Sequence, residues 1–260
     1  MEFRSILYSA GERIARITLN RADSRNALDE NTVNELTTAV GMASRDPAVK
    51  VVHLAAAGKT FCAGTDTATL ERLAAGDLEQ HRTDSIRLST LLRALHESRK
   101  PVVALVQGPA LGVGCGIVCA CDFVLAARDG ARFGCPDVQR GIAPALVMLF
   151  LCKRVGEGRA RELILSGGSA TALEAHRMGL VSAVCADEKL AAEAAVLTDT
   201  LLHRNSATAM ALTKELLAKL PGMNMSDALD FATNMNAAAG MTAEGKKGVQ
   251  EFLNNQQSEW

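Results

Sequence analysis

Residues 100–122 read KPVVALVQGPALGVGCGIVCACD, and this stretch organises the rest of the chain. The run Pro101–Val106 predicts a fully buried strand, which Gln107-Gly108-Pro109 interrupts. Gly112-Val113-Gly114 then opens an apolar run with helical spacing that ends at Asp122. A strand that feeds a glycine-rich turn into a helix leaves backbone N–H groups free at a positive dipole end. Such a turn can hold a phosphate or an oxyanion.

Three other interpretations compete for this stretch. Val102–Cys121 is long enough for a membrane span, but it contains Gln107, Pro109 and glycines and lacks flanking aromatic residues. A dinucleotide fingerprint requires glycine where Ile117 stands. Plain close packing of a helix on a sheet would also explain these residues if they stood alone.

The composition favours one large enzyme-sized domain, or a domain with a tail. The chain has 260 residues and a formal net charge of −1, which gives no electrostatic footprint for nucleic acid or an anionic membrane. The seven cysteines fit small core residues in a reducing compartment, and their spacing resembles no zinc site. No secretion, peroxisomal or retention signal is recognisable, so we expect the cytoplasm, or an organelle matrix after processing.

Period-two patterns and turn residues predict strands in the first half of the chain, and helical spacing dominates the second half. Phe3–Tyr8 and Arg13–Leu19 form an expected hairpin around Ala10-Gly11-Glu12. Further expected strands are Val49–Ala55, Phe123–Ala127, a strand end at Arg132–Asp137, and Leu180–Val184. Expected helices are Asn31–Ser44, Leu70–Arg99 with a break at Gly76-Asp77, Ala145–Arg154, Gly158–Leu165, Ala172–Met178 and most of the chain after Asp187.

A second strand-to-turn passage follows Val49–Ala55. Its sequence, Phe61-Cys62-Ala63-Gly64-Thr65-Asp66, precedes another helical segment. Both passages run from a strand through a glycine-containing turn into a helical segment, so they offer two backbone turns that could face one point.

Four motifs in this order resemble the crotonase superfamily of enoyl-CoA hydratases and isomerases. They are FCAGTD, KPVVALVQGPALGVGCG…CD, FGCPDVQRGIAP and HRMGLV, and the tail AEGKKGVQEFL resembles that family's terminal helix. The resemblance implies an α/β fold, a spiral of repeated ββα units over residues 1–186. It implies a helical C-terminal region over residues 187–260 that supports a homotrimer or a dimer of trimers.

The resemblance also implies an acyl-coenzyme A thioester as the ligand. The family's two oxyanion-hole donors fall on the backbone N–H groups of Thr65 and Val113. Val113 departs from the family's usual glycine, and its stiff side chain predicts ordinary helical or β dihedrals there. Coenzyme A belongs to the substrate, and no further cofactor, metal, nucleic acid or membrane partner is expected.

The family's two catalytic glutamates are both altered. The first position is Gly116 and the second is Asp137, a shorter acid. Asp137 could act as general acid and base if apolar neighbours such as Pro136 and Ile142 raise its pKa, or it could merely cap a turn. The family's glycine after the Ile-Pro break is Ala145, and Leu146-Val147-Met148 predict an apolar acyl pocket.

The remaining candidates would bind substrate. Asp66 more plausibly caps the following helix, and Arg25 could meet a phosphate or be a solvated surface residue. None of the histidines matches a catalytic position of the family. The substrate-binding candidates are Arg25, Ala27, Leu28, Ala63, Gly64, Asp66, Leu111, Gly112, Gly116, Pro136, Pro144 and Ala145.

The expected reaction is hydration or dehydration of a 2-enoyl-CoA, with a branched or glutaconyl-type acyl group as one option. The missing carboxylate at Gly116 keeps two alternatives open: a double-bond isomerase, which needs one acid, and a catalytically silent acyl-CoA-binding homologue.

Overall fold

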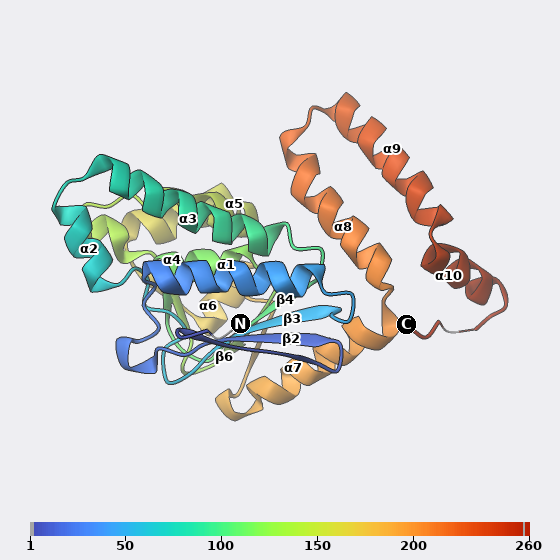
Figure 1. Cartoon of the computed structure of the whole chain (residues 1–260), viewed down its shortest axis with the longest axis horizontal. Coiled ribbons are helices and arrows are strands. Elements are labelled where there is room, and N and C mark those ends of the chain that lie inside the picture. Colours follow the sequence, from blue (N-terminus) through green and yellow to red (C-terminus); the bar gives the residue numbers. More distant parts are fainter. Residues whose placement is uncertain (1–2, 257) are drawn as a thin grey trace.

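The computed structural model describes residues 3–256 and 258–260 and shows a two-sheet α/β body with a helical arm (Figure 1). The larger sheet has the strand order β1-β2-β3-β4-β6-β9. Only β1 and β2 are antiparallel; every later neighbour in this sheet pairs in parallel. Its strands are β1 (Ile6–Gly11), β2 (Ile14–Leu19), β3 (Val51–Ala56), β4 (Val102–Val106), β6 (Phe123–Ala127) and β9 (Ala183–Cys185).

A smaller sheet of order β5-β7-β8 lies at the ends of these strands. Its members are β5 (Ala110–Leu111), β7 (Arg132–Gly134) and β8 (Ser169–Thr171). The chain passes from β4 to β5 and then into a helix, and from β6 to β7 and then into another helix. This alternation is the predicted spiral of ββα units.

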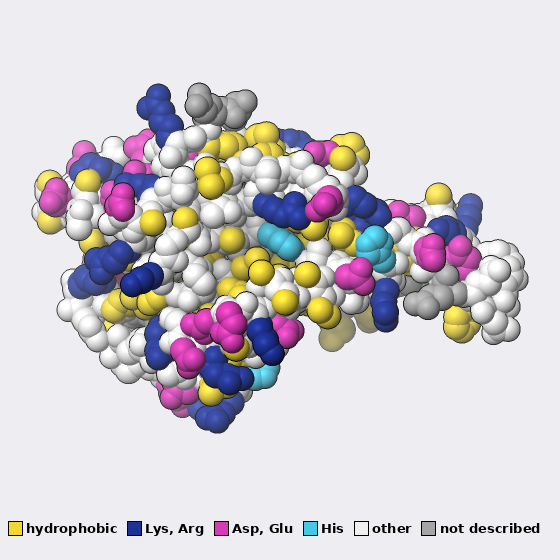
Figure 2. Space-filling view, turned by 90° about the horizontal axis from the view of Figure 1, so that it is seen from below, with side chains coloured by type: hydrophobic (Ala, Val, Ile, Leu, Met, Phe, Trp, Pro, Cys, Tyr) yellow, Lys and Arg dark blue, Asp and Glu magenta, His cyan; other side chains and the backbone are white. Residues whose placement is uncertain are grey.

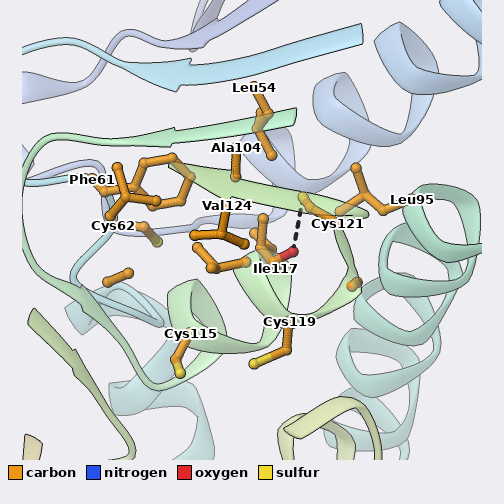
Figure 3. Packing of buried hydrophobic residues seen from close by; sticks show 14 of the residues in the cluster. Leu54, Phe61, Cys62, Leu95, Ala104, Cys115, Ile117, Cys119, Cys121 and Val124 are labelled. Carbon is orange, nitrogen blue, oxygen red and sulfur yellow. Dashed lines mark hydrogen bonds between the residues drawn. The ribbon is translucent and has the colours of Figure 1, made fainter. Parts of the chain in front are cut away.

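Helices cover both faces of the larger sheet (Figure 1). One face buries an aliphatic core whose members include Leu54, Ala104, Ile117 and Val124. In Figure 3, Ile117 points toward the sheet while Cys115 and Cys119 point away from it. The helices of the body are α1 (Glu30–Arg45), α2 (Thr67–Ala74), α3 (Leu78–His96), α4 (Val113–Ala120), α5 (Ala145–Ser166), α6 (Ala172–Arg177) and α7 (Leu190–Asp199).

Helix α7 covers the opposite face of the sheet, where Leu190 and Ala194 pack with Val51, Val103 and Leu125. The helical tail therefore begins with a helix that belongs to the packing of the body. After a π-helical turn over Thr200–Arg204, the helices α8 (Ala207–Lys219), α9 (Met225–Met241) and α10 (Ala243–Leu253) form the projecting arm in Figure 1. The division between residues 186 and 187 stays a prediction.

Several predicted boundaries were wrong. The hairpin turn is Glu12-Arg13, with φ of 54° and 64°, and not Ala10-Gly11-Glu12. Pairing with β3 explains the shift, because the Arg13 carbonyl accepts the Lys50 N–H at 2.7 Å and must sit at the strand end. The last strand starts at Ala183, not Leu180, because the N–H groups of Leu180 and Val181 both turn back to the Ala175 carbonyl. By contrast, the two expected helices Ala145–Arg154 and Gly158–Leu165 are both present within α5, separated at Gly156, whose φ of 77° and ψ of 161° are non-helical.

The ion pair between the buried Lys214 of α8 and the partly buried Asp122 joins the arm to the body. Asp122 also accepts the Val102 N–H at 2.7 Å, at the start of β4. The residue that closes the 100–122 stretch therefore fastens both β4 and the arm. Among residues 3–256 and 258–260, no helix combines the length and the apolar character that a membrane crossing requires.

Candidate active site

Three backbone segments that pair in parallel bring the predicted site residues to one place. Cys62 pairs in parallel with Ala110, and Ala110 pairs in parallel with Phe133. Because parallel segments end at the same edge of a sheet, the residues that follow these segments converge. Each site residue follows the paired residue of its own segment by three or four positions, at the same edge: Thr65, Val113 and Asp137.

The two glycine-containing turns touch directly. The Leu111 N–H donates to the Cys62 carbonyl at 2.9 Å, and a Cβ on Gly64 would lie 3.1 Å from the Leu111 carbonyl oxygen. Gly64 has φ 101° and Gly112 has φ 52°, the left-handed region that favours glycine. The two turns therefore lie against each other, and that both face one bound oxygen stays a prediction.

The predicted donors are both free. Within the described part of the chain, the N–H of Thr65 and the N–H of Val113 each lack a hydrogen-bond acceptor. Val113 is the first residue of α4 after the N-cap Gly112, so its N–H lies at the positive end of the helix dipole. Helical geometry at Val113 agrees with the expectation drawn from its stiff side chain.

Asp137 stands beside the second turn. It lies in the short 3₁₀ helix Pro136–Arg140, immediately after β7. A Cβ on Gly112 would lie 3.3 Å from Asp137 Oδ2, and that oxygen is buried without a hydrogen-bond partner among the described residues. Burial raises the pKa of the Asp137 carboxyl, while its own backbone N–H and Arg140 lower it in part. A partly buried carboxyl with one unpaired oxygen and a raised pKa is suited to proton transfer.

Position 116 is closed. A Cβ on Gly116 would lie 3.0 Å from Val147 Cγ2, and Val147 of α5 is 3% exposed. The site therefore has the Asp137 carboxyl at one of the two family positions and an apolar contact at the other.

Some of the substrate-binding candidates hold the site together through backbone hydrogen bonds, and others are exposed around it. Leu28 pairs with Thr65, and its N–H donates to the Gly64 carbonyl at 2.8 Å. The Arg25 carbonyl accepts the Ala63 N–H at 3.1 Å, while the Arg25 residue itself is exposed. The Asp66 carboxylate accepts the Thr69 N–H at 2.8 Å, which confirms its expected role as a helix cap. Ala27, Leu111, Pro136 and Pro144 are partly exposed, and Ala145 is exposed at the start of α5.

Asn26 was missed as a positioning residue. Its side chain is 1% exposed, donates to the carbonyls of Ala57 and Thr60 at 2.8 Å each, and accepts the Arg21 N–H at 2.8 Å. These bonds hold the 25–28 segment against the chain that leads into the first donor turn. Asn26 adopts a φ of 53°. Asparagine tolerates the left-handed region better than most residues, so an asparagine in this polar turn was the sequence signal for such a position.

The cavity over the other face of the sheet is separate from this site. A groove of about 710 Å³ lies between α7 and the strands β2–β4, with Arg16, His53 and Thr198 among its lining residues. Figure 2 views this side of the molecule. His53 Nε2 lies 2.7 Å from Thr198 Oγ1, and burial lowers the pKa of His53 to about 4. His53 is therefore neutral near pH 7 and held by Thr198, in agreement with a structural role. The groove shares no residue with the site around Asp137.

Fold and site together define a spiral α/β protein with free backbone donors on two adjacent turns and an acid, Asp137, with one buried, unpaired oxygen. The chain belongs to the enoyl-CoA hydratase/isomerase family, which it matches over residues 9–260. It is 36% identical over 240 residues to a putative enoyl-CoA hydratase of Thermus thermophilus, covering 92% of this chain and 94% of that protein. It is 31% identical over 255 residues to a crotonyl-CoA hydratase of Syntrophomonas wolfei, covering 97% and 96%.

The fold agrees with solved structures. The crystal structure of an enoyl-CoA hydratase of Mycobacterium smegmatis superposes with a TM-score of 0.93, at 31% identity and 99% coverage of both chains. One from Shewanella pealeana superposes with a TM-score of 0.92, at 28% identity, covering 100% of this chain and 97% of the other.

Proposed function

We propose that this protein binds acyl-CoA thioesters and catalyses the reversible hydration of a 2-enoyl-CoA. The observation that carries the proposal is the free N–H pair of Thr65 and Val113 beside the partly buried carboxyl of Asp137. An enolate formed next to a thioester carbonyl carries its charge on oxygen, and each preorganised donor contributes about 100- to 1,000-fold in rate. The family relationship and the names of the relatives support the same activity.

The ionised Asp137 carboxylate takes a proton from water as the water oxygen bonds to C3. The C2–C3 double-bond electrons move toward the thioester carbonyl and give an enolate, whose oxygen accepts hydrogen bonds from the Thr65 and Val113 N–H groups. The protonated Asp137 then gives its proton to C2, the enolate returns to a thioester, and the carboxylate is restored. One water has been added, and dehydration is the reverse.

This mechanism needs Asp137 ionised in the free enzyme. Because burial raises the pKa of Asp137, the acid limb of kcat/KM lies at a higher pH than an ordinary aspartate would give. Shortening glutamate to aspartate also withdraws the carboxyl by about one C–C bond, and a misplacement on the order of 1 Å can cost about 100-fold. We therefore expect a slow enzyme unless the backbone around Asp137 compensates.

The activity is tested by the absorbance of crotonyl-CoA during hydration, with the wild type and Asp137→Asn. Turnover by the wild type and at least a 100-fold loss in the variant would support the proposal. If the wild type hydrates no 2-enoyl-CoA, or the variant keeps full activity, the proposal fails. Titration calorimetry with acetoacetyl-CoA tests thioester binding separately and distinguishes a silent acyl-CoA-binding protein from one without thioester affinity.

Double-bond isomerisation is the second candidate. Val147 closes position 116, and the Asp66 carboxylate is engaged as the cap of α2, so Asp137 is the carboxyl with an unpaired oxygen beside the donors. Moving one proton between C4 and C2 of a 3-enoyl thioester needs a single acid/base. A 3-enoyl-CoA assay beside the crotonyl-CoA assay decides between the two reactions.

We also propose assembly into a homotrimer or a dimer of trimers. Large apolar side chains of the arm are exposed, including Leu217, Leu229, Val249 and Phe252 at 60–78%. Apolar surface of this kind is typical of a protein–protein contact. Light scattering at micromolar concentration tests assembly, and a stable monomer would contradict it.

A further inference from the structure

The start of helix α4 contacts both the proposed catalytic acid, Asp137, and the apolar side chain of Val147. Gly112 is the N-cap that precedes α4, with φ 52° and ψ −122°, and Gly116 lies in the first turn of the helix. The direction from Gly112 meets the Asp137 carboxyl, and the direction from Gly116 meets Val147 Cγ2. Asp137 and Val147 therefore both lie against the start of α4, Asp137 at its N-cap and Val147 within its first turn.

Val147 is held firmly in this place. It lies in the first turn of α5, after Pro144, and its side chain is 3% exposed, whereas its neighbours Met148 and Leu149 are 44% and 59% exposed. A Cβ on Gly116 would stand 3.5 Å from Val147 Cα as well as 3.0 Å from Cγ2. The tight contact is with the Cγ2 methyl group, whereas 3.5 Å to Cα is ordinary van der Waals contact, so the valine side chain fills the space beside Gly116.

We infer that Val147 determines acyl-chain specificity, by forming the wall next to the acyl carbons beyond C3. This inference rests on the proposed acyl-CoA function. A thioester with its oxygen on the Val113 N–H and C2 beside Asp137 has its next carbons within a few ångströms of those groups. The Val147 side chain lies against the first turn of α4, at Gly116, three residues after the Val113 donor. Its size and apolar character would favour a short acyl chain and limit a longer one.

The test compares the affinity for hexanoyl-CoA with that for butyryl-CoA, by titration calorimetry, in Val147→Ala. Removing two methyl groups enlarges the pocket, and differences of one methylene change discrimination by about 10- to 200-fold. We expect the ratio of affinities to shift at least about 10-fold toward hexanoyl-CoA. The ratio of kcat/KM for 2-hexenoyl-CoA over crotonyl-CoA should shift in the same direction.

The contact itself is tested by a size exchange. Gly116→Ala places a methyl group against Val147 and should weaken butyryl-CoA binding about 10-fold. The double variant Gly116→Ala/Val147→Ala should recover most of that loss, because the added methyl occupies the space that the valine leaves. Val155→Ala is the matched control: it makes the same truncation on α5, eight residues further, at a partly buried core position.

The outcomes separate specificity from stability. Urea unfolding of each variant shows whether it is folded, and Val155→Ala should lose stability without changing the hexanoyl-to-butyryl ratio. An unchanged ratio in folded Val147→Ala, or a ratio that shifts equally in Val155→Ala, overturns the inference. Crotonyl-CoA hydration without a shift in selectivity leaves the proposed function standing and the inference wrong. A shift in the ratio of affinities without any hydration supports the role of Val147 and contradicts the proposed hydration. A wild type that binds neither acyl-CoA contradicts both.

Discussion

The carboxyl of Asp137 lies against the backbone of Gly112, so close that a Cβ on this glycine would stand 3.3 Å from Oδ2 and 3.4 Å from Oδ1. Gly112 immediately precedes the free N–H of Val113. The parallel pairing of β5 with β7 causes this proximity, because Leu111 and Gly134 are partners and the Gly112 N–H donates to the Gly134 carbonyl at 2.8 Å. The acid and one oxyanion donor are thus positioned by the same two short strands.

Asp137→Asn should raise the free energy of unfolding near neutral pH. The folded pKa of Asp137 is raised, so the protonated carboxyl stabilises the fold, and this contribution is lost as the pH rises through the folded pKa. An uncharged amide avoids that loss, and the difference between variant and wild type should narrow as the pH falls from about 7 to about 4.

Thermal unfolding of both proteins across this pH range measures the difference. Asp230→Asn on the arm is the control, because this aspartate is exposed and should change little. A wild type that is more stable than Asp137→Asn at neutral pH would show that the carboxylate has a stabilising partner.

Val113→Pro should remove catalysis while it preserves the fold. Val113 is the first helical residue after the N-cap, the position at which proline is tolerated because its missing N–H is not part of the helix. The substitution deletes one proposed oxyanion donor, so kcat should fall about 100- to 1,000-fold. Steady-state kinetics with crotonyl-CoA and urea unfolding measure the two effects.

Val113→Ala keeps the N–H and is the matched comparison for Val113→Pro. We expect the alanine variant to retain most of the kcat. Equal activity of the two variants would mean that this N–H does not stabilise the transition state.

Lys214→Met should destabilise the protein by about 3 kcal/mol, because it leaves Asp122 without its cation in a partly buried position. Adding Asp122→Asn should restore part of that free energy by removing the unpaired charge. Urea unfolding measures both variants. A loss below about 1 kcal/mol in the single variant would place this ion pair among the weak surface pairs.

The sequence predicted the parts of the fold that depend on short-range pattern. The glycine-rich turns, the strand before α4 and the Asp66 cap follow from local residue preferences, and the structure has each of them. The contact between Gly116 and Val147 joins residues 31 positions apart, so no local pattern indicates it. Likewise, Asn26 bonds carbonyls of Ala57 and Thr60 across more than 30 residues. The hairpin turn moved because pairing with β3 outweighed the local preference of Gly11.

The central claim is that Asp137 moves a proton at C2 of a thioester whose enolate oxygen is held by the Thr65 and Val113 N–H groups. The most direct test is incorporation of deuterium at C2 of butyryl-CoA in D₂O, followed by mass spectrometry. This saturated thioester cannot be hydrated, so exchange reports the proton transfer alone. We predict exchange with the wild type and at least a 100-fold slower exchange with Asp137→Asn, while Asp230→Asn behaves as the wild type. Equal exchange rates for Asp137→Asn and the wild type would contradict the account.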